Sequence, residues 1–90
     1  MAELGVVPLG NGHFRVTVAE GGSTTTHDVA VPAATMARLG WTKTPEELLR
    51  GSFQFMLRRE SKESILSRFD VSVIARYFPE FEREIARPAG

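Results

Sequence analysis

The stretch HFRVTVAEGGSTTTHDVAV, residues 13–31, predicts a β-hairpin. Apolar Phe14, Val16 and Val18 alternate with more polar neighbours, which is the period of a strand with one buried face. The Gly21–Gly22 pair follows, and glycine accepts the positive φ angles that both central positions of a tight hairpin turn require. The chain then resumes with a second strand-forming run, rich in threonine and valine.

A turn centred on these two glycines fixes the register of the hairpin. Three cross-strand pairs then match in chemistry, one apolar, one ionic and one between threonines: Phe14 with Val29, Arg15 with Asp28, and Thr17 with Thr26. The same register places His27 opposite Val16, at the border of the core, and His13 on the other face. Because a shift of one residue would turn the apolar side chains to the wrong face, we expect this pairing.

Upstream of the hairpin, Leu4–Leu9 has the composition of a short edge strand. Pro8 suits an edge, since proline has no amide hydrogen to donate to a neighbouring strand. The Gly10–Gly12 segment then predicts a turn. Residues 1–12 therefore have two candidate states, a third strand of the sheet or a flexible end, and residues 87–90 are expected to be flexible.

Helix signals dominate the chain after the hairpin. Pro32 and Gly40 bracket a short helix, because proline favours the first helical position and glycine the position just past the end. Thr44–Glu47 is the strongest local signal, with a capping threonine, a proline in the first turn and a glutamate that completes a capping box. This second helix should run from Pro45 to about Arg59.

The C-terminal third predicts further short helical segments: one after Ser61 that holds Ile65, Leu66 and Phe69, one over residues 71–78 capped by Asp70, and one over residues 80–85. Together the elements predict a single α+β domain over residues 1–90, an N-terminal β-hairpin or three-stranded sheet followed by three to four short α-helices. The expected core is Phe14, Val16, Val18, Val29, Val31, Leu39, Leu49, Phe53, Met56, Leu66, Ile74 and Phe78.

Composition and charge exclude several classes of protein. The chain has 11 basic and 11 acidic residues, so no global charge draws it to nucleic acid or to anionic lipid. No apolar run is long enough to span a membrane, and residues 1–9 lack the features of a signal peptide. The chain has no cysteine, which fits a reducing compartment. We therefore expect a cytoplasmic protein that does not contact a membrane.

Motifs that carry chemistry are absent from the sequence. His13 and His27 lie on opposite faces of the predicted hairpin, so they cannot bind one metal ion within one chain. There is no G-x-S-x-G elbow and no Gly-Lys-Ser/Thr phosphate loop, and the glycine clusters are explained by turns. We therefore expect no cofactor, no metal and no enzymatic activity.

Three segments give the chain a resemblance to known proteins: TPEELLRGSFQFML at residues 44–57, KESILSRFD at residues 62–70 and RYFPEFE at residues 76–82. Together with the preceding hairpin, this block resembles short bacterial proteins of unknown function. The resemblance implies a bacterial, cytoplasmic setting. It implies no activity, cofactor or residue role.

A protein-contact surface is the leading functional hypothesis. Apolar residues cover an arc of roughly 200° on the predicted Pro45 helix, wider than a one-sided stripe. Six of the eight aromatic residues fall within residues 53–81, in a chain with little interior to hold them. We therefore expect self-association as a homodimer, or contact with another protein, through five candidate residues: Leu48, Phe55, Val73, Tyr77 and Phe81.

Two alternatives from other classes accompany this hypothesis. A DNA-binding regulator would use basic residues of the helical region, namely Arg58, Arg59, Lys62 and Arg76. That region has few polar side chains suited to reading bases, so nucleic acid is the weaker hypothesis. A small-molecule site would lie near Trp41, between the first two helices, although a tryptophan there also serves to anchor the helix on the core.

Overall fold

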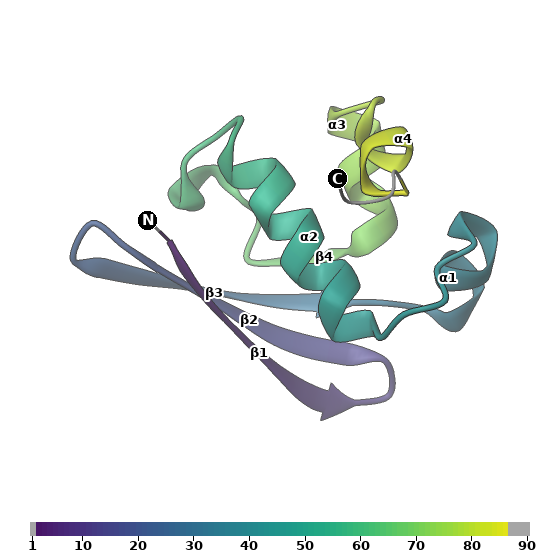
Figure 1. The fold of residues 1–90 in the computed structure, drawn as a ribbon. Coiled ribbons are helices and arrows are strands. Elements are labelled where there is room, and N and C mark those ends of the chain that lie inside the picture. Colours follow the sequence, from purple (N-terminus) through teal and green to yellow (C-terminus); the bar gives the residue numbers. More distant parts are fainter. Residues whose placement is uncertain (1, 87–90) are drawn as a thin grey trace.

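The computed structural model describes residues 2–86 and has an α+β fold (Figure 1). Four strands form one sheet in the order β1-β2-β3-β4: β1 Glu3–Gly10, β2 His13–Glu20, β3 Ser23–Ala30 and β4 Arg68–Asp70. The helical elements are α1 Ala33–Leu39, α2 Pro45–Leu57, the 3₁₀ turns η1 Lys62–Ser64 and η2 Val71–Val73, α3 Ile74–Tyr77 and α4 Phe81–Ile85. The flexible end expected at residues 87–90 lies outside the described residues.

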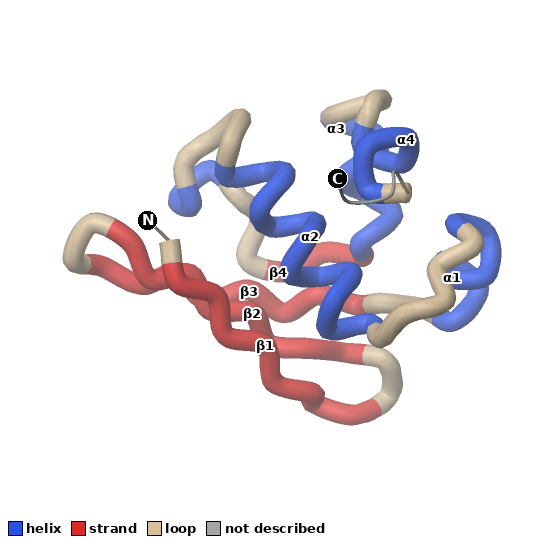
Figure 2. The backbone as a smooth tube through the Cα atoms, in the orientation of Figure 1, coloured by secondary structure: helices blue, strands red, loops and turns tan. Residues whose placement is uncertain are grey.

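All helices lie on one side of the sheet, so the sheet has one covered and one open face (Figure 2). The covered face carries the buried side chains of the hairpin, including Phe14, Val16 and Val18. Their neighbours Arg15 and Thr17 point to the open face and are exposed or half-buried. The alternation in the sequence therefore corresponds to these two faces.

The hairpin has the predicted register. Phe14 pairs with Val29, Arg15 with Asp28, Val16 with His27, and Thr17 with Thr26. The predicted ion pair between Arg15 and Asp28 does not form, because Asp28 Oδ1 lies 3.0 Å from His13 Nδ1, within hydrogen-bond distance. His13 is the diagonal neighbour of Asp28 on the open face, which is within reach of a histidine side chain.

The N-terminal segment forms a strand. Leu4 and Val6 of β1 pair with Val18 and Val16 of β2 and pack against the core. The register shifts between Pro8 and Gly10, where β1 ends. Of the two states considered for residues 1–12, the third strand is the one observed over Glu3–Gly10.

The prediction of a helix after Ser61 is wrong. Only the single turn η1 forms, and the chain then extends into β4, which pairs parallel to β3 with Phe69 opposite Val29. The Asp28 N–H donates to the Ser67 carbonyl at 2.8 Å and leads into this ladder. A helix of so few residues has little stability of its own, whereas the extended form gains strand pairing and packs the Phe69 ring 6.2 Å from that of Phe53.

Helix α2 lies between the sheet and the C-terminal helices. Its N-terminus is capped as predicted, with the Glu47 N–H donating to Thr44 Oγ1 at 3.1 Å, and it ends at Leu57, two residues before the expected Arg59. Its wide apolar arc is covered on both sides within the chain: the buried residues are Leu48, Leu49, Ser52, Phe53, Phe55 and Met56.

Helix α4 closes over the outer side of α2. A Cβ atom on Gly51 would lie 2.8 Å from Ile85 Cδ1, so the absence of a side chain at Gly51 permits this close approach. The Phe55 ring of α2 packs edge-on against Phe78 at 5.7 Å and Phe81 at 5.2 Å between ring centroids. The chain itself therefore provides the second layer that the sequence suggested a partner would supply.

Most of the predicted core is confirmed. Nine of the twelve expected residues are buried, whereas Leu39 and Phe78 are half-buried and Leu66 is 48% exposed, because Leu66 lies in the extended segment rather than on a helix. The core also contains five residues that the prediction lacked: Leu48, Phe55, Ile65, Val71 and Phe81.

The C-terminal end of α2 is held by Arg59. Its Nη1 donates to the Phe55 carbonyl at 3.0 Å, its Nε donates to Glu80 Oε2 at 3.2 Å, and its guanidinium carbon lies 3.6 Å from the centre of the Phe55 ring. The backbone N–H of Glu80 and the Arg59 guanidinium hold the pKa of the Glu80 carboxyl below its usual range. Arg59 therefore links α2 to the segment that leads into α4.

Replacing Arg59 by Ala should lower the free energy of unfolding by about 1 kcal/mol, mainly through the lost cation–π contact and the lost hydrogen bond to Phe55. Because the pKa of Glu80 is lowered in the folded chain, its ionised form stabilises the fold above the usual carboxyl pKa, and this contribution is lost as the pH falls through the folded pKa. The difference between wild type and variant should therefore be smaller at about pH 3 than at pH 7. Urea unfolding at pH 7 and at about pH 3 measures the difference in the free energy of unfolding between wild type and Arg59→Ala. Arg58→Ala, at an exposed neighbour, should change stability by less than about 0.5 kcal/mol, and an equal loss from both variants would contradict the role of Arg59.

Candidate protein-contact groove

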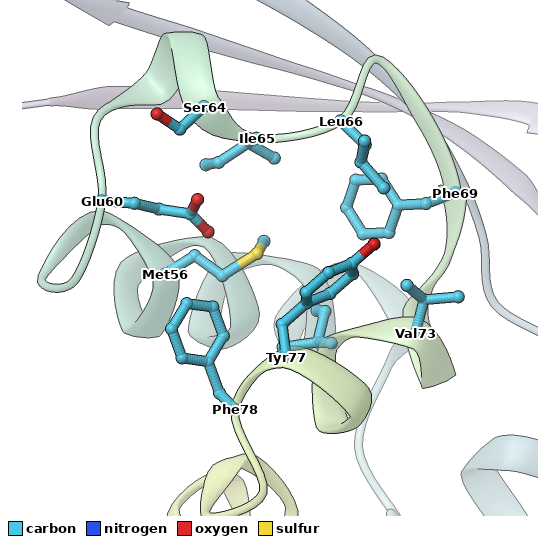
Figure 3. Close-up of a pocket in the computed structure, with 10 residues that line it drawn as sticks. Met56, Glu60, Ser64, Ile65, Leu66, Phe69, Val73, Tyr77 and Phe78 are labelled. Atoms are coloured by element: carbon cyan, nitrogen blue, oxygen red, sulfur yellow. The ribbon is translucent and has the colours of Figure 1, made fainter.

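An apolar groove opens on the surface between the C-terminal end of α2, the segment around Ile65, β4 and α3 (Figure 3). Its volume is about 330 Å³. Eight of its lining residues are apolar or aromatic and two are polar: Met56, Ile65, Leu66, Phe69, Val73, Ile74, Tyr77 and Phe78, with Glu60 and Ser64. Pockets of this size and lining are typical of sites that receive an apolar group.

The groove has a buried floor and an exposed rim. Met56, Ile65 and Ile74 belong to the hydrophobic core and form the floor. At the rim, Leu66 is 48% exposed and Tyr77 is 67% exposed, and Figure 3 shows both side chains among those that line the groove. Two large side chains exposed beside an apolar hollow form a contiguous apolar surface, unlike hydrophobic residues exposed singly.

A buried histidine holds one side of this groove in place. His27 is 2% exposed and, as its pairing with Val16 predicts, borders the core. Its Nδ1–H donates to the Leu66 carbonyl at 2.7 Å, and its Nε2 lies 2.8 Å from Thr25 Oγ1. Its ring centroid lies 5.3 Å from that of Phe53. The hairpin thereby positions the Leu66 segment that forms the rim.

Among residues 2–86, Glu60 is the one charged side chain that lines the groove. It is half-buried, and its carboxylate points inward beside Met56 and Ile65 (Figure 3). Within residues 2–86, no basic side chain forms an ion pair with it. The groove can therefore receive an apolar group together with a cation.

Three of the five candidate contact residues lie in the interior. Leu48, Phe55 and Phe81 are at most 2% exposed, because α2 is covered by the sheet on one side and by the C-terminal helices on the other. A partner cannot reach them in this fold. Val73 and Tyr77 do line the groove, and the structure adds Leu66 and Glu60, which no pattern in the sequence marked as contact residues.

The four candidate nucleic-acid residues do not form one basic face. Arg59 is engaged by Glu80, and Lys62 is only 6% exposed, with its Nζ 2.8 Å from Glu63 Oε2. This hydrogen bond lowers the pKa of the Glu63 carboxyl. Arg58 lies in a separate hollow between α2 and β1, and Arg76 lies on α3. No basic patch of the kind that supports DNA binding results from these four positions.

Trp41 acts as an anchor at the start of α2. Its indole N–H donates to the Thr44 carbonyl at 2.9 Å, and its half-buried ring packs against the core. It lines neither the groove nor the hollow beside Arg58.

The described part of the chain contains no group of three or more histidine, aspartate or glutamate side chains placed to hold a metal ion. Over the same residues, every helix is too short or too polar to cross a lipid bilayer. No protein family, characterised protein or solved structure matches this chain in the comparisons. The groove is therefore the feature of this molecule from which a function can be proposed.

Proposed function

We propose that this is a non-enzymatic protein that acts through protein–protein contacts and self-associates through the groove. The observation that carries the proposal is the apolar hollow with the exposed Leu66 and Tyr77 side chains at its rim. The bacterial, cytoplasmic setting is part of the same proposal and is supported by the resemblance and by the absence of cysteine.

Pairing of two sheets along the β1 edge is a less favourable route to a dimer. Pro8 has no amide hydrogen to donate from this edge. The Leu4 carbonyl already accepts a hydrogen bond from Arg50 Nη1 at 2.9 Å. Such features protect edge strands from pairing with another chain.

The open face of the sheet also lacks the features of a core interface. It presents Arg15, Thr17, Thr26 and Asp28, which are polar or charged and typical of a solvated face. Since interface cores are depleted in charged residues, the groove is the better candidate.

The groove also suits contact between identical chains. A two-fold contact uses the same patch on both copies, so the patch must carry both a projection and a hollow. Tyr77 and Leu66 supply the projection beside the hollow that would receive their counterparts. The chain has equal numbers of acidic and basic residues, so two copies do not repel each other through net charge.

Sedimentation equilibrium tests this proposal. Wild-type protein should show twice the chain mass at concentrations of about 10–100 μM, and Tyr77→Ser should raise the dimer dissociation constant by at least about tenfold, as loss of a central aromatic contact does. Val7→Ser, at another exposed apolar residue far from the groove lining, should leave the constant unchanged. A wild-type monomer at about 100 μM would overturn self-association, and an equal effect of both variants would place the contact elsewhere.

A further inference from the structure

The groove leaves one charge without a partner. Glu60 is a half-buried residue whose side chain lines the groove among apolar side chains, and no cation of residues 2–86 is paired with it. A molecule bound in the groove would exclude more water from Glu60. It would raise the free-energy cost of the carboxylate charge unless it also supplied a cation. A second copy of the chain in the groove should therefore supply a basic side chain.

The basic residues near the groove differ in their availability. Arg59 and Lys62 are engaged by Glu80 and Glu63. Arg68 precedes the groove residue Phe69 on β4. Because successive strand residues point to opposite faces of the sheet, Arg68 points away from the groove. Arg58 lies in the hollow between α2 and β1.

Arg76 remains. It is exposed, it forms no ion pair with another described residue, and it precedes the rim residue Tyr77 on α3. It also follows the groove residue Val73 by three positions, so the two are surface neighbours along this helical segment. A second copy that places Tyr77 at the groove brings its own Arg76 to the same region.

We infer that Arg76 of each copy pairs with Glu60 of the other across the two-fold axis. This inference rests on the proposed self-association. Because the contact is reciprocal, one pair implies its symmetry mate, and the dimer gains two ion pairs that fix the register of the apolar contact. A partner protein with a basic residue beside a bulky apolar one would satisfy the same groove, and the experiment below separates that outcome from a second copy.

Charge reversal tests the pairing. Glu60→Arg and Arg76→Glu should each weaken the homodimer by about tenfold, because each variant places like charges at both symmetry-related contacts. Mixing the two variants in equal amounts restores opposite charges at both contacts. The mixture should therefore form a heterodimer with a dissociation constant close to that of the wild-type homodimer, measured by sedimentation or by fluorescence transfer between labelled variants.

Arg58→Glu serves as the matched control, since it changes the net charge by the same amount as Arg76→Glu at a residue outside the groove. It should leave the dimer intact, and circular dichroism confirms that each variant is folded. If each single variant dimerises as wild type does, or if mixing the two variants does not restore the dimer, the Glu60–Arg76 pairing is wrong although the homodimer itself exists. A wild-type monomer would instead overturn the proposed function, together with this pairing.

Discussion

Replacing Phe55 by Ala should lower the free energy of unfolding by about 3–5 kcal/mol, the usual cost of truncating a fully buried aromatic residue. Phe55 is 2% exposed and contacts Phe78, Phe81 and the Arg59 guanidinium. It therefore joins α2 to α4 and to the residue that follows α3. A domain of this size has a total stability of roughly 5–15 kcal/mol, so this loss is a large fraction of the whole.

Tyr77→Ala provides the matched control for this prediction. Both residues are aromatic and both were candidates for a partner surface, but Tyr77 is 67% exposed. Its truncation should cost less than about 1 kcal/mol in urea unfolding, provided that the protein is dilute enough to be monomeric. If Phe55→Ala cost as little as Tyr77→Ala, the C-terminal helices would not cover α2 as the structure shows.

The strands and the register of the hairpin could be predicted because their determinants are local. The two turn glycines and the chemistry of the paired side chains all lie within residues 13–31. The cap of α2 is also local, as Thr44 and Glu47 are three residues apart. In both cases, the residues that form the element also provide its stop and start signals.

Strand β4 could not be predicted in the same way. It comprises three residues and depends on parallel pairing with β3, about forty residues earlier in the chain. The apolar pattern of Ile65, Leu66 and Phe69 is compatible with a helix, and only the packing of Phe69 against Phe53 and the hydrogen bond from His27 to the Leu66 carbonyl favour the extended form. Because this segment forms part of the groove lining, the groove could not be predicted from the sequence either.

The wide apolar arc of α2 correctly indicated a helix that is covered on more than one side. It did not indicate what covers it, because an apolar surface is buried equally well by the same chain or by a partner. In this fold, Phe81 and its neighbours on α4 supply the cover. The contact surface proposed above is correspondingly smaller and is confined to the groove and its rim.

Replacing His27 by Ala should lower the free energy of unfolding by about 3 kcal/mol, through the lost ring volume beside Phe53 and the loss of its hydrogen bonds in the core. His27→Phe keeps an aromatic ring but leaves the Leu66 carbonyl and the Thr25 hydroxyl without this partner. We expect it to cost about 1–3 kcal/mol, the range for a buried polar group that loses its hydrogen bond.

Since His27 also holds the Leu66 segment, these variants should affect the groove as well as the fold. At temperatures where His27→Phe is still folded, its dimer dissociation constant should exceed that of wild type, because the rim residue Leu66 is no longer fixed by its carbonyl. His13→Ala removes the exposed histidine that pairs with Asp28 and should change stability by less than about 1 kcal/mol, with no effect on the dimer. A His27→Phe variant that matched wild type in stability would show that the buried hydrogen bonds do not hold the Leu66 segment. One that lost stability but dimerised normally would separate the core role of His27 from the groove.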